Sequence, residues 1–144
     1  MTETEGRRWL LKASHEGAWL YQPIESTATG IGIPDGYFRT RVAEGWIELK
    51  VINFHGQEHV VIPFRRGQYN WLKRYADLGG RAFLFVFYVA HLRQDTVCVM
   101  IFYNDYIQRE YDVQEMALKA LVDLPLSKIT HEQLIQSLSH SLIL

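Results

Sequence analysis

The sequence contains one cysteine, Cys98, among 144 residues. A lone thiol excludes an intramolecular disulfide, and a metal cluster built on several thiolates is unsupported. The six histidines show no zinc-type spacing together with cysteines. The pair four residues apart, His55 and His59, lies in a glycine-containing segment typical of a turn and strand at the surface. We therefore expect Cys98 to be a buried strand residue in the apolar run 96–103.

Long apolar runs and an excess of charge are also missing. No run reaches the roughly 18 residues that a membrane span requires, and the amino terminus lacks the charged-then-apolar order of a signal peptide. Lys and Arg number 15 and Asp and Glu number 16, so the formal net charge is -1. These features predict a cytoplasmic protein without a membrane partner. They exclude a polybasic chain that binds nucleic acid through its overall charge.

Hydrophobic residues make up 48% of the chain, and no repeat, low-complexity segment or long linker interrupts it. A chain of this length can bury about two thirds of its unfolded surface, which is enough for one core. We therefore expect residues 1–144 to form a single domain.

The hydrophobic pattern predicts strands in the middle of the chain and helices around them. Expected helices cover residues 5–16, 67–78, 112–122 and 131–142; expected strands cover 18–25, 36–42, 46–53, 58–62, 81–90 and 96–104, with a loop at 26–34 and a connection at 91–95. This order favours an α/β fold with a central sheet. It also makes the part from about 110 to 144 mainly helical.

Two acids and a lysine stand out in segment 30–54, which reads as a β-hairpin with a charged turn at 43–45. Because side chains alternate along a strand, Glu48 and Lys50 share a face. Asp35 starts the first strand directly after a proline, and strand pairing brings its carboxylate beside Glu48. We predict two converging acids with an ammonium next to them.

Two converging carboxylates repel each other unless a cation lies between them, and their oxygens suit Mg²⁺ or Mn²⁺. The ammonium of Lys50 can orient an attacking water and stabilise charge that develops on phosphorus. This arrangement indicates metal-assisted phosphodiester hydrolysis. The alternative is an exposed hairpin on which Glu48 and Lys50 form a weak ion pair, and the residues alone leave both interpretations open.

The order Pro34-Asp35, then Glu48-Leu49-Lys50 thirteen positions later, resembles the PD-(D/E)XK nuclease superfamily, which includes restriction endonucleases and archaeal Holliday junction resolvases. The run 32–35 looks most like its virus-type replication-repair nuclease branch (VRR-NUC). That branch also places a glutamine at the start of the helix after the motif strands, and Gln68 occupies this place here. The resemblance covers about residues 30 to 90, the motif core.

The resemblance implies a restriction-endonuclease-like fold, with a central mixed β-sheet flanked by helices, and a metal-dependent DNA endonuclease. Asp35, Glu48 and the backbone carbonyl of Leu49 are then expected to hold Mg²⁺ or Mn²⁺. Lys50 would position or activate the water, and Gln68 would hold that water, the lysine or a nearby phosphate. A junction or flap is the expected substrate, because the chain is too short to display an evident sequence-recognition domain.

The superfamily often carries another acid on its first helix. Glu5, Glu16 and Glu25 are the candidates here, and we favour Glu5, which would reach the metal through water. The alternative for each is a charge at a helix end or in a loop.

Basic residues gather in the segment that carries the motif: Arg39, Arg41, Lys50, Arg65, Arg66, Lys73 and Arg74. Contacts from such residues to phosphates dominate the affinity of proteins for DNA. Arg65 and Arg66 are the best candidates because they precede the helix that begins at Gln68. The alternative is that these residues are ordinary solubilising charge.

Segment 129–144 carries one apolar stripe, with Leu134, Leu138 and Leu142 at helical spacing after a capping box formed by Thr130 and Gln133. The stripe either covers the core of its own chain or pairs with a second copy. A homodimer would supply two active sites for the two strands of a DNA substrate. The rival function is a catalytically inactive DNA- or protein-binding factor of a phage or mobile element that keeps the nuclease fold.

Overall fold

The computed structural model describes residues 1–24, 32–54, 56–90 and 96–140. Its helices are α1 (Glu3–Gly17), α2 (Gln68–Asp77), α3 (Val113–Lys119) and α4 (His131–Leu138). Its strands are β1 (Leu20–Pro23), β2 (Gly36–Arg39), β3 (Glu44–Val51), β4 (His59–Val61), β5 (Ala82–Ala90), β6 (Thr96–Tyr103), β7 (Glu110–Asp112) and β8 (Val122–Pro125). Short 3-10 turns, η2 (Asn104–Tyr106) and η3 (Leu126–Lys128), complete the described elements.

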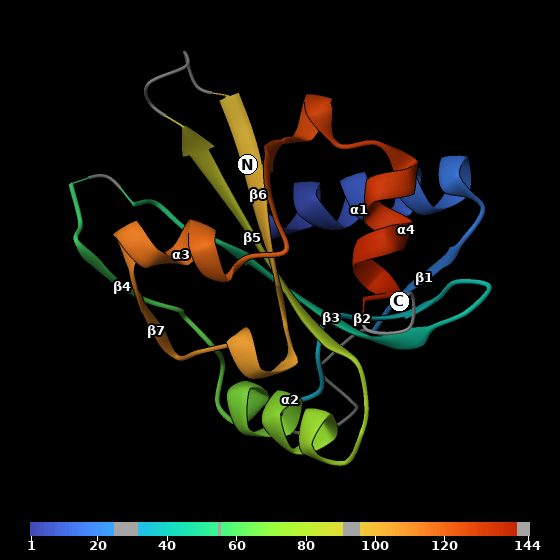
Figure 1. Ribbon diagram of the computed structural model, residues 1–144, viewed down its shortest axis with the longest axis horizontal. Helices are drawn as coiled ribbons and strands as arrows, with labels where there is room; N and C mark the ends of the chain where they lie inside the picture. The colour runs from blue at the N-terminus through green and yellow to red at the C-terminus, as the bar shows by residue number, and fades with distance from the viewer. Residues whose placement is uncertain (25–31, 55, 91–95, 141–144) are drawn as a thin grey trace.

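Six strands form the central sheet in the order β1-β2-β3-β5-β6-β8, while β4 and β7 form a separate antiparallel pair. Only the β3 and β5 pair is parallel among the neighbours in the central sheet. A parallel neighbour needs a long crossover, and α2 lies within it (Figure 1). The predicted mixed sheet with flanking helices is confirmed.

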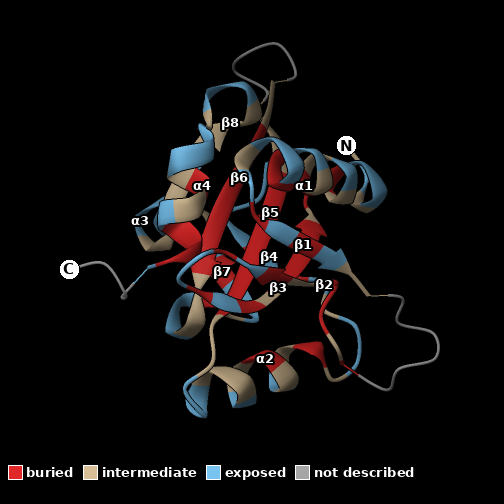
Figure 2. Cartoon of the chain, turned by 90° about the vertical axis from the view of Figure 1, so that its right-hand side faces the viewer, coloured by how far each residue is buried: buried red, intermediate tan, exposed pale blue. Residues whose placement is uncertain are grey.

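Each face of the central sheet carries its own core, since the side chains of β5 alternate between them. Phe83, Phe85 and Phe87 point to the first core, with residues of α1 and α4. Ala82, Leu84 and Val86 point to the second core, with residues of α2, α3 and the β4-β7 pair. Figure 2 shows β3, β5 and β6 as the most buried part of the sheet.

Helix α4 begins as the sequence predicts, at a capping box of Thr130 and Gln133. Leu134 and Leu138 are 2% and 0% exposed and belong to the first core. The apolar stripe of α4 therefore covers the core of its own chain. Leu142 lies outside the described residues. No helix in the described ranges is long and apolar enough to cross a membrane.

The turn between β2 and β3 comes earlier than predicted, at residues 40–43 instead of 43–45. The Thr40 hydroxyl accepts hydrogen bonds from the amides of Val42 and Ala43, which closes the turn there. Gly45 lies within β3, and a Cβ at this position would lie 2.1 Å from the carbonyl oxygen of Arg81. The glycine permits close backbone approach and does not make the turn.

The carboxyl-terminal part is less helical than predicted. Residues 110–112 form β7 against β4, and residues 122–125 form β8 against β6. Strands of three and four residues are too short to show the alternation that identifies a strand in a sequence. β7 and β8 are strands because they pair with β4 and β6, which are distant in the sequence.

Candidate active site

Two hydrogen bonds between side chain and backbone hold Asp35 against the end of β3, one with Glu48 and one with Leu49. The β2 and β3 strands pair up to Gly36 and Ile47. One residue beyond, the Asp35 amide donates to Glu48 Oε1 at 3.1 Å, and the Leu49 amide donates to Asp35 Oδ2 at 2.8 Å. The carboxylates thus continue the ladder where backbone pairing stops. The predicted convergence of the two acids is present in the structure.

Lys50 extends this cluster toward the first helix. Its Nζ lies 3.2 Å from Glu48 Oε2 and 3.7 Å from Glu3 Oε1. Glu48 is 0% exposed, Lys50 3% and Asp35 8%. Charged groups are rarely buried so completely unless they are paired or coordinate a metal. An exposed hairpin with a weak surface ion pair, the alternative left open above, does not describe this burial.

The pKa of Glu48 is raised from its ordinary value to about 8. Burial is the main cause, and the negative charge of Asp35 adds to it, while the Lys50 ammonium opposes both. The two carboxylates therefore repel each other in a site that water hardly reaches. A cation between them would relieve that repulsion and favour the ionised form of Glu48.

The donor set fits a hard divalent cation. Glu48 Oε2 is buried and accepts no hydrogen bond, so it has capacity for a metal in addition to its ion pair with Lys50. Carboxylate and carbonyl oxygens are the ligands that Mg²⁺ and Mn²⁺ prefer. Within the described ranges, no group of three or more His, Cys, Asp or Glu side chains is placed to hold a metal ion. Asp35 and Glu48 would be the two carboxylate ligands.

Two further residues of the cluster escaped the sequence analysis. Arg7 on α1 has an Nη2 atom 3.8 Å from Asp35 Oδ1. Burial raises the pKa of Tyr21 on β1; the charges of Asp35 and Glu48 raise it further, and Arg7 lowers it. Arg7 lies one helical turn after Glu3, a spacing that places both on one face of α1. That spacing is the feature of the sequence from which Arg7 could have been assigned to the cluster. No local pattern in the sequence places Tyr21 near the acids, because their proximity depends on the pairing of β1 with β2.

Gln68 is 3% exposed and opens α2. Its Oε1 accepts a hydrogen bond of 2.8 Å from the Arg65 amide, which fixes the start of the helix. This helix start is packed against the chain that enters Asp35, because a Cβ on Gly32 would lie 2.5 Å from the Gly67 carbonyl oxygen and 3.2 Å from the Gln68 amide nitrogen. Gln68 is therefore a buried residue whose side-chain oxygen accepts a backbone hydrogen bond.

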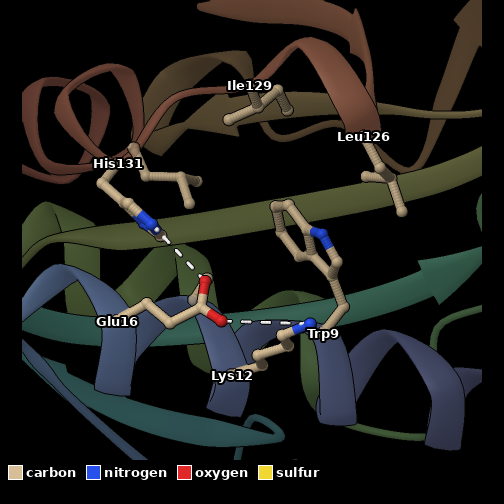
Figure 3. A pocket seen from close by; sticks show the side chains of 8 residues that line it. Trp9, Lys12, Glu16, Leu126, Ile129 and His131 are labelled. Carbon is tan, nitrogen blue, oxygen red and sulfur yellow. Dashed lines mark ion pairs between the residues drawn. The ribbon is translucent and has the colours of Figure 1, made fainter.

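The three candidate acids of the first helix have different places. Glu5 forms the capping box with Thr2 and an ion pair with the amino terminus at 3.5 Å. Glu16 pairs with His131 and Lys12 beside a pocket of about 220 Å³ between α1 and α4, at the other end of the helix (Figure 3). Glu25 lies outside the described residues. Glu3, not considered from sequence, is the acid next to Lys50.

The proposed phosphate-binding residues do not all lie alike. Arg65 and Arg66 are exposed directly before α2. Lys73 Nζ donates to the Asn104 carbonyl at 3.4 Å, and Arg39 forms an exposed ion pair with Glu44 at 3.7 Å. Arg41 is exposed in the turn between β2 and β3, and Arg74 is exposed on α2. Arg65 and Arg66 are thus exposed directly before Gln68, whereas Lys73 and Arg39 contact other groups.

The structure is similar to solved structures of known proteins. No protein-family model matches the sequence, and no curated protein matches it either. The structure is similar to that of Hjc, a Holliday junction resolvase from the archaeal hyperthermophile Archaeoglobus fulgidus, with a TM-score of 0.57 and 13% sequence identity. The alignment covers 87% of this chain and 97% of that chain. This likeness confirms the expected resolvase and restriction-endonuclease-like fold.

Proposed function

We propose that the protein is a metal-dependent DNA endonuclease of the PD-(D/E)XK type. The observation that carries the proposal is the buried cluster of Asp35, Glu48 and Lys50 at the point where β2 and β3 separate. An amide hydrogen bond joins Asp35 to Glu48, and an ion pair joins Glu48 to Lys50. Burying three charged groups costs free energy that a purely structural role does not require. The resolvase fold supports a nuclease, and the run 32–35 with Gln68 favours the VRR-NUC branch.

In the proposed mechanism, a bound Mg²⁺ or Mn²⁺ supplies Lewis acidity toward the phosphodiester and lowers the pKa of water. Asp35, Glu48 and the Leu49 carbonyl would hold the ion. The Lys50 ammonium positions the attacking water and meets the negative charge that develops on phosphorus. Gln68, buried at the start of α2, orients a phosphate or the water on that side. Glu3 holds Lys50 from α1.

The proposed substrate is branched DNA, such as a junction or flap. The neighbour named above is a Holliday junction resolvase, and the alignment covers 97% of that chain. Because both strands of a branched substrate must be cut, a homodimer with two active sites is the proposed assembly. The proposed location is inside the cell, where the DNA substrate is. Arg65 and Arg66 would bind backbone phosphates beside the site.

The test is a cleavage panel of branched, single-stranded and duplex DNA with Mn²⁺, Mg²⁺ or EDTA. Wild-type protein should cut branched DNA only with a divalent ion. Asp35→Asn and Glu48→Gln should each lower the rate by at least about 10³, because each loses a metal ligand, while the metal-free fold is retained. Glu16→Gln, which removes a charge at the other end of α1, is the matched control. Undiminished cutting by either site variant would contradict the assignment.

A second candidate is a DNA-binding factor that keeps the fold without catalysis. The observation that favours it is the presence of two cationic groups, Lys50 and Arg7, already facing the acids at 3.2 and 3.8 Å. In that case the wild-type protein retains branched DNA in a gel-shift assay and leaves it intact with every ion. Binding without cleavage would therefore replace the first proposal by the second.

A further inference from the structure

Buried polar atoms without a hydrogen-bond partner are concentrated at the acid cluster. In the part of the chain that the structure describes, these side-chain atoms are Arg7 Nε, Trp19 Nε1, Tyr21 OH, Glu48 Oε2 and Ser139 Oγ. Three of the five belong to residues of the cluster. A buried polar group that lacks a partner is destabilising, so each such group calls for an explanation. The Glu48 oxygen has one in the proposed metal, whereas the Tyr21 hydroxyl has only the neighbouring Arg7 guanidinium.

The ring of Tyr21 is 3% exposed and lies directly against Gly36, the residue after Asp35. A Cβ at Gly36 would come within 2.5 to 2.7 Å of the ring carbons and the hydroxyl oxygen of Tyr21. Glycine inside a strand weakens it, because it has no side chain to pack. Two locally unfavourable features, a strand glycine and an unpartnered hydroxyl, therefore coincide beside the acid. Such coincidences are typical of functional sites.

The chemical surroundings make the Tyr21 hydroxyl a donor. A phenol carries one hydrogen that it can donate, and the Arg7 guanidinium interacts with the same hydroxyl. The negative neighbours of the phenol are acceptors: the Leu49 amide occupies Asp35 Oδ2, and Arg7 faces Oδ1 at 3.8 Å, which is longer than a hydrogen bond.

We propose that Tyr21 is a positioning residue of the metal site. Its hydroxyl donates a hydrogen bond, directly or through one water, to Asp35 Oδ1 when a divalent cation is bound, and thereby fixes the orientation of that carboxylate. Partners of this kind, which hold a metal ligand from behind, usually change metal affinity by about 10- to 100-fold. The inference rests on the proposed metal-dependent function and adds a residue that the motif does not contain.

Tyr111 on β7 provides a matched control. It is 1% exposed, and its ring packs against Phe102 in the second core. Unlike Tyr21, its hydroxyl is satisfied: it accepts from the Gln108 amide at 2.9 Å and donates to the Tyr106 carbonyl at 2.5 Å. Removing this hydroxyl loses two hydrogen bonds of a structural kind. Tyr→Phe at the two positions thus separates a structural hydroxyl from one that serves the metal site.

The experiment measures Mn²⁺ affinity by calorimetric titration and thermal unfolding with EDTA or MnCl₂. Tyr21→Phe should leave the metal-free Tm unchanged or higher, since it removes an unpartnered polar group, and should weaken Mn²⁺ binding by about tenfold or more. Tyr111→Phe should lower the Tm in both conditions and leave Mn²⁺ affinity unchanged. Tyr21→Phe should also keep its ring packed on Gly36, so the fold is preserved.

Two outcomes overturn the inference, and they differ. If wild-type protein binds Mn²⁺ and Tyr21→Phe binds it within twofold of wild type, the positioning role is wrong and the proposed function stands. If wild-type protein shows neither binding heat nor a shift in Tm with Mn²⁺, the metal-dependent function fails and the role of Tyr21 fails with it.

Discussion

The two ends of α1 carry the same kinds of charged residue in opposite surroundings. At the amino-terminal end, Glu3 and Arg7 face a cluster in which Lys50 is 3% exposed. At the other end, Lys12 pairs with Glu16 at 3.9 Å, with side chains 77% and 51% exposed. Residue type is therefore shared between the two ends. The two ends differ in how far the charged residues that pair with the helix are buried.

This difference teaches how to read the ion pairs of the molecule. Pairs of exposed charges contribute about 0 to 1 kcal/mol, because water screens them. Buried pairs lose solvation that their attraction seldom fully restores, so replacing them by apolar residues is often neutral or stabilising. The exposed pairs at Glu16 are consistent with ordinary surface charge. The buried cluster is better explained by chemistry than by stability.

Replacing the lysine of the buried cluster or the lysine of the exposed pair by methionine gives the largest expected difference in cleavage rate. Lys50→Met should lower single-turnover cleavage by about 10² to 10³, the usual loss when one electrostatic stabiliser is removed, with DNA affinity nearly unchanged. Lys12→Met, which removes a lysine of an exposed ion pair on α1, should cut at the wild-type rate. A large loss of affinity with normal cleavage would make Lys50 a phosphate clamp instead.

Titration sharpens the comparison further. The Glu48 carboxyl ionises near its ordinary pKa of 4.5 in the unfolded chain and only near pH 8 in the metal-free fold. The folded state therefore binds the extra proton in this window, and stability should fall as pH rises from about 4.5 through about 8. The slope is at most about 1.4 kcal/mol per pH unit.

Urea unfolding in EDTA between pH 5 and 9 measures this effect. Glu48→Gln should lack the part of the decrease that Glu48 causes, while Glu16→Gln should keep it. Identical pH profiles for wild type and Glu48→Gln would show that the raised pKa is not expressed in stability.

The arginines before α2 are expected to give a smaller change. Arg65→Ala combined with Arg66→Ala should weaken DNA binding about equally for all sequences and reduce the slope of log affinity against log salt by up to about two units, because each phosphate contact releases about one counterion. Fluorescence anisotropy at several salt concentrations measures the slope. Cleavage at saturating protein should persist, and an unchanged slope would mean that DNA follows another path.

The smallest effect is expected at the exposed end of α1. Glu16→Gln breaks the contacts with Lys12 and His131, whose side chains are 77% and 48% exposed. Surface substitutions of this kind rarely change stability measurably. Calorimetry should give a Tm within about 1 °C of wild type. A clear drop in Tm or cleavage would assign the pocket beside Glu16 a role that surface charge does not have.

The sequence predicted the acid cluster because its members lie on one hairpin. Alternation along β3 and the proline before Asp35 are local properties, and they were sufficient to bring Asp35, Glu48 and Lys50 together. The long apolar runs of β5 and β6 were equally clear. Arg7 and Tyr21 could not be assigned, because their neighbours come from elements that meet only through tertiary packing.

The first-helix acid illustrates how a boundary decides a site. The helix was expected to begin at residue 5, which favoured Glu5 as the acid near the metal. It begins at Glu3, and Thr2 caps it through Glu5. The carboxylate of Glu5 is consequently used at the helix end, and Glu3 lies beside Lys50. Boundaries depend on capping geometry, which a hydrophobic pattern reports least well.

The contact between Gly32 and Gly67 has a consequence for how this hairpin tolerates changes in length. Both glycines have positive φ angles, 91° and 85°, and no side chain can be placed on Gly32. The backbone at Gly32 thus packs directly against the backbone at Gly67, and Asp35 and Gln68 lie next to this contact. Insertions in the turn at 40–43 extend the far tip of the hairpin and leave the base in register. The hairpin tip is therefore an exchangeable module, whereas a single added methyl group at the base displaces the site.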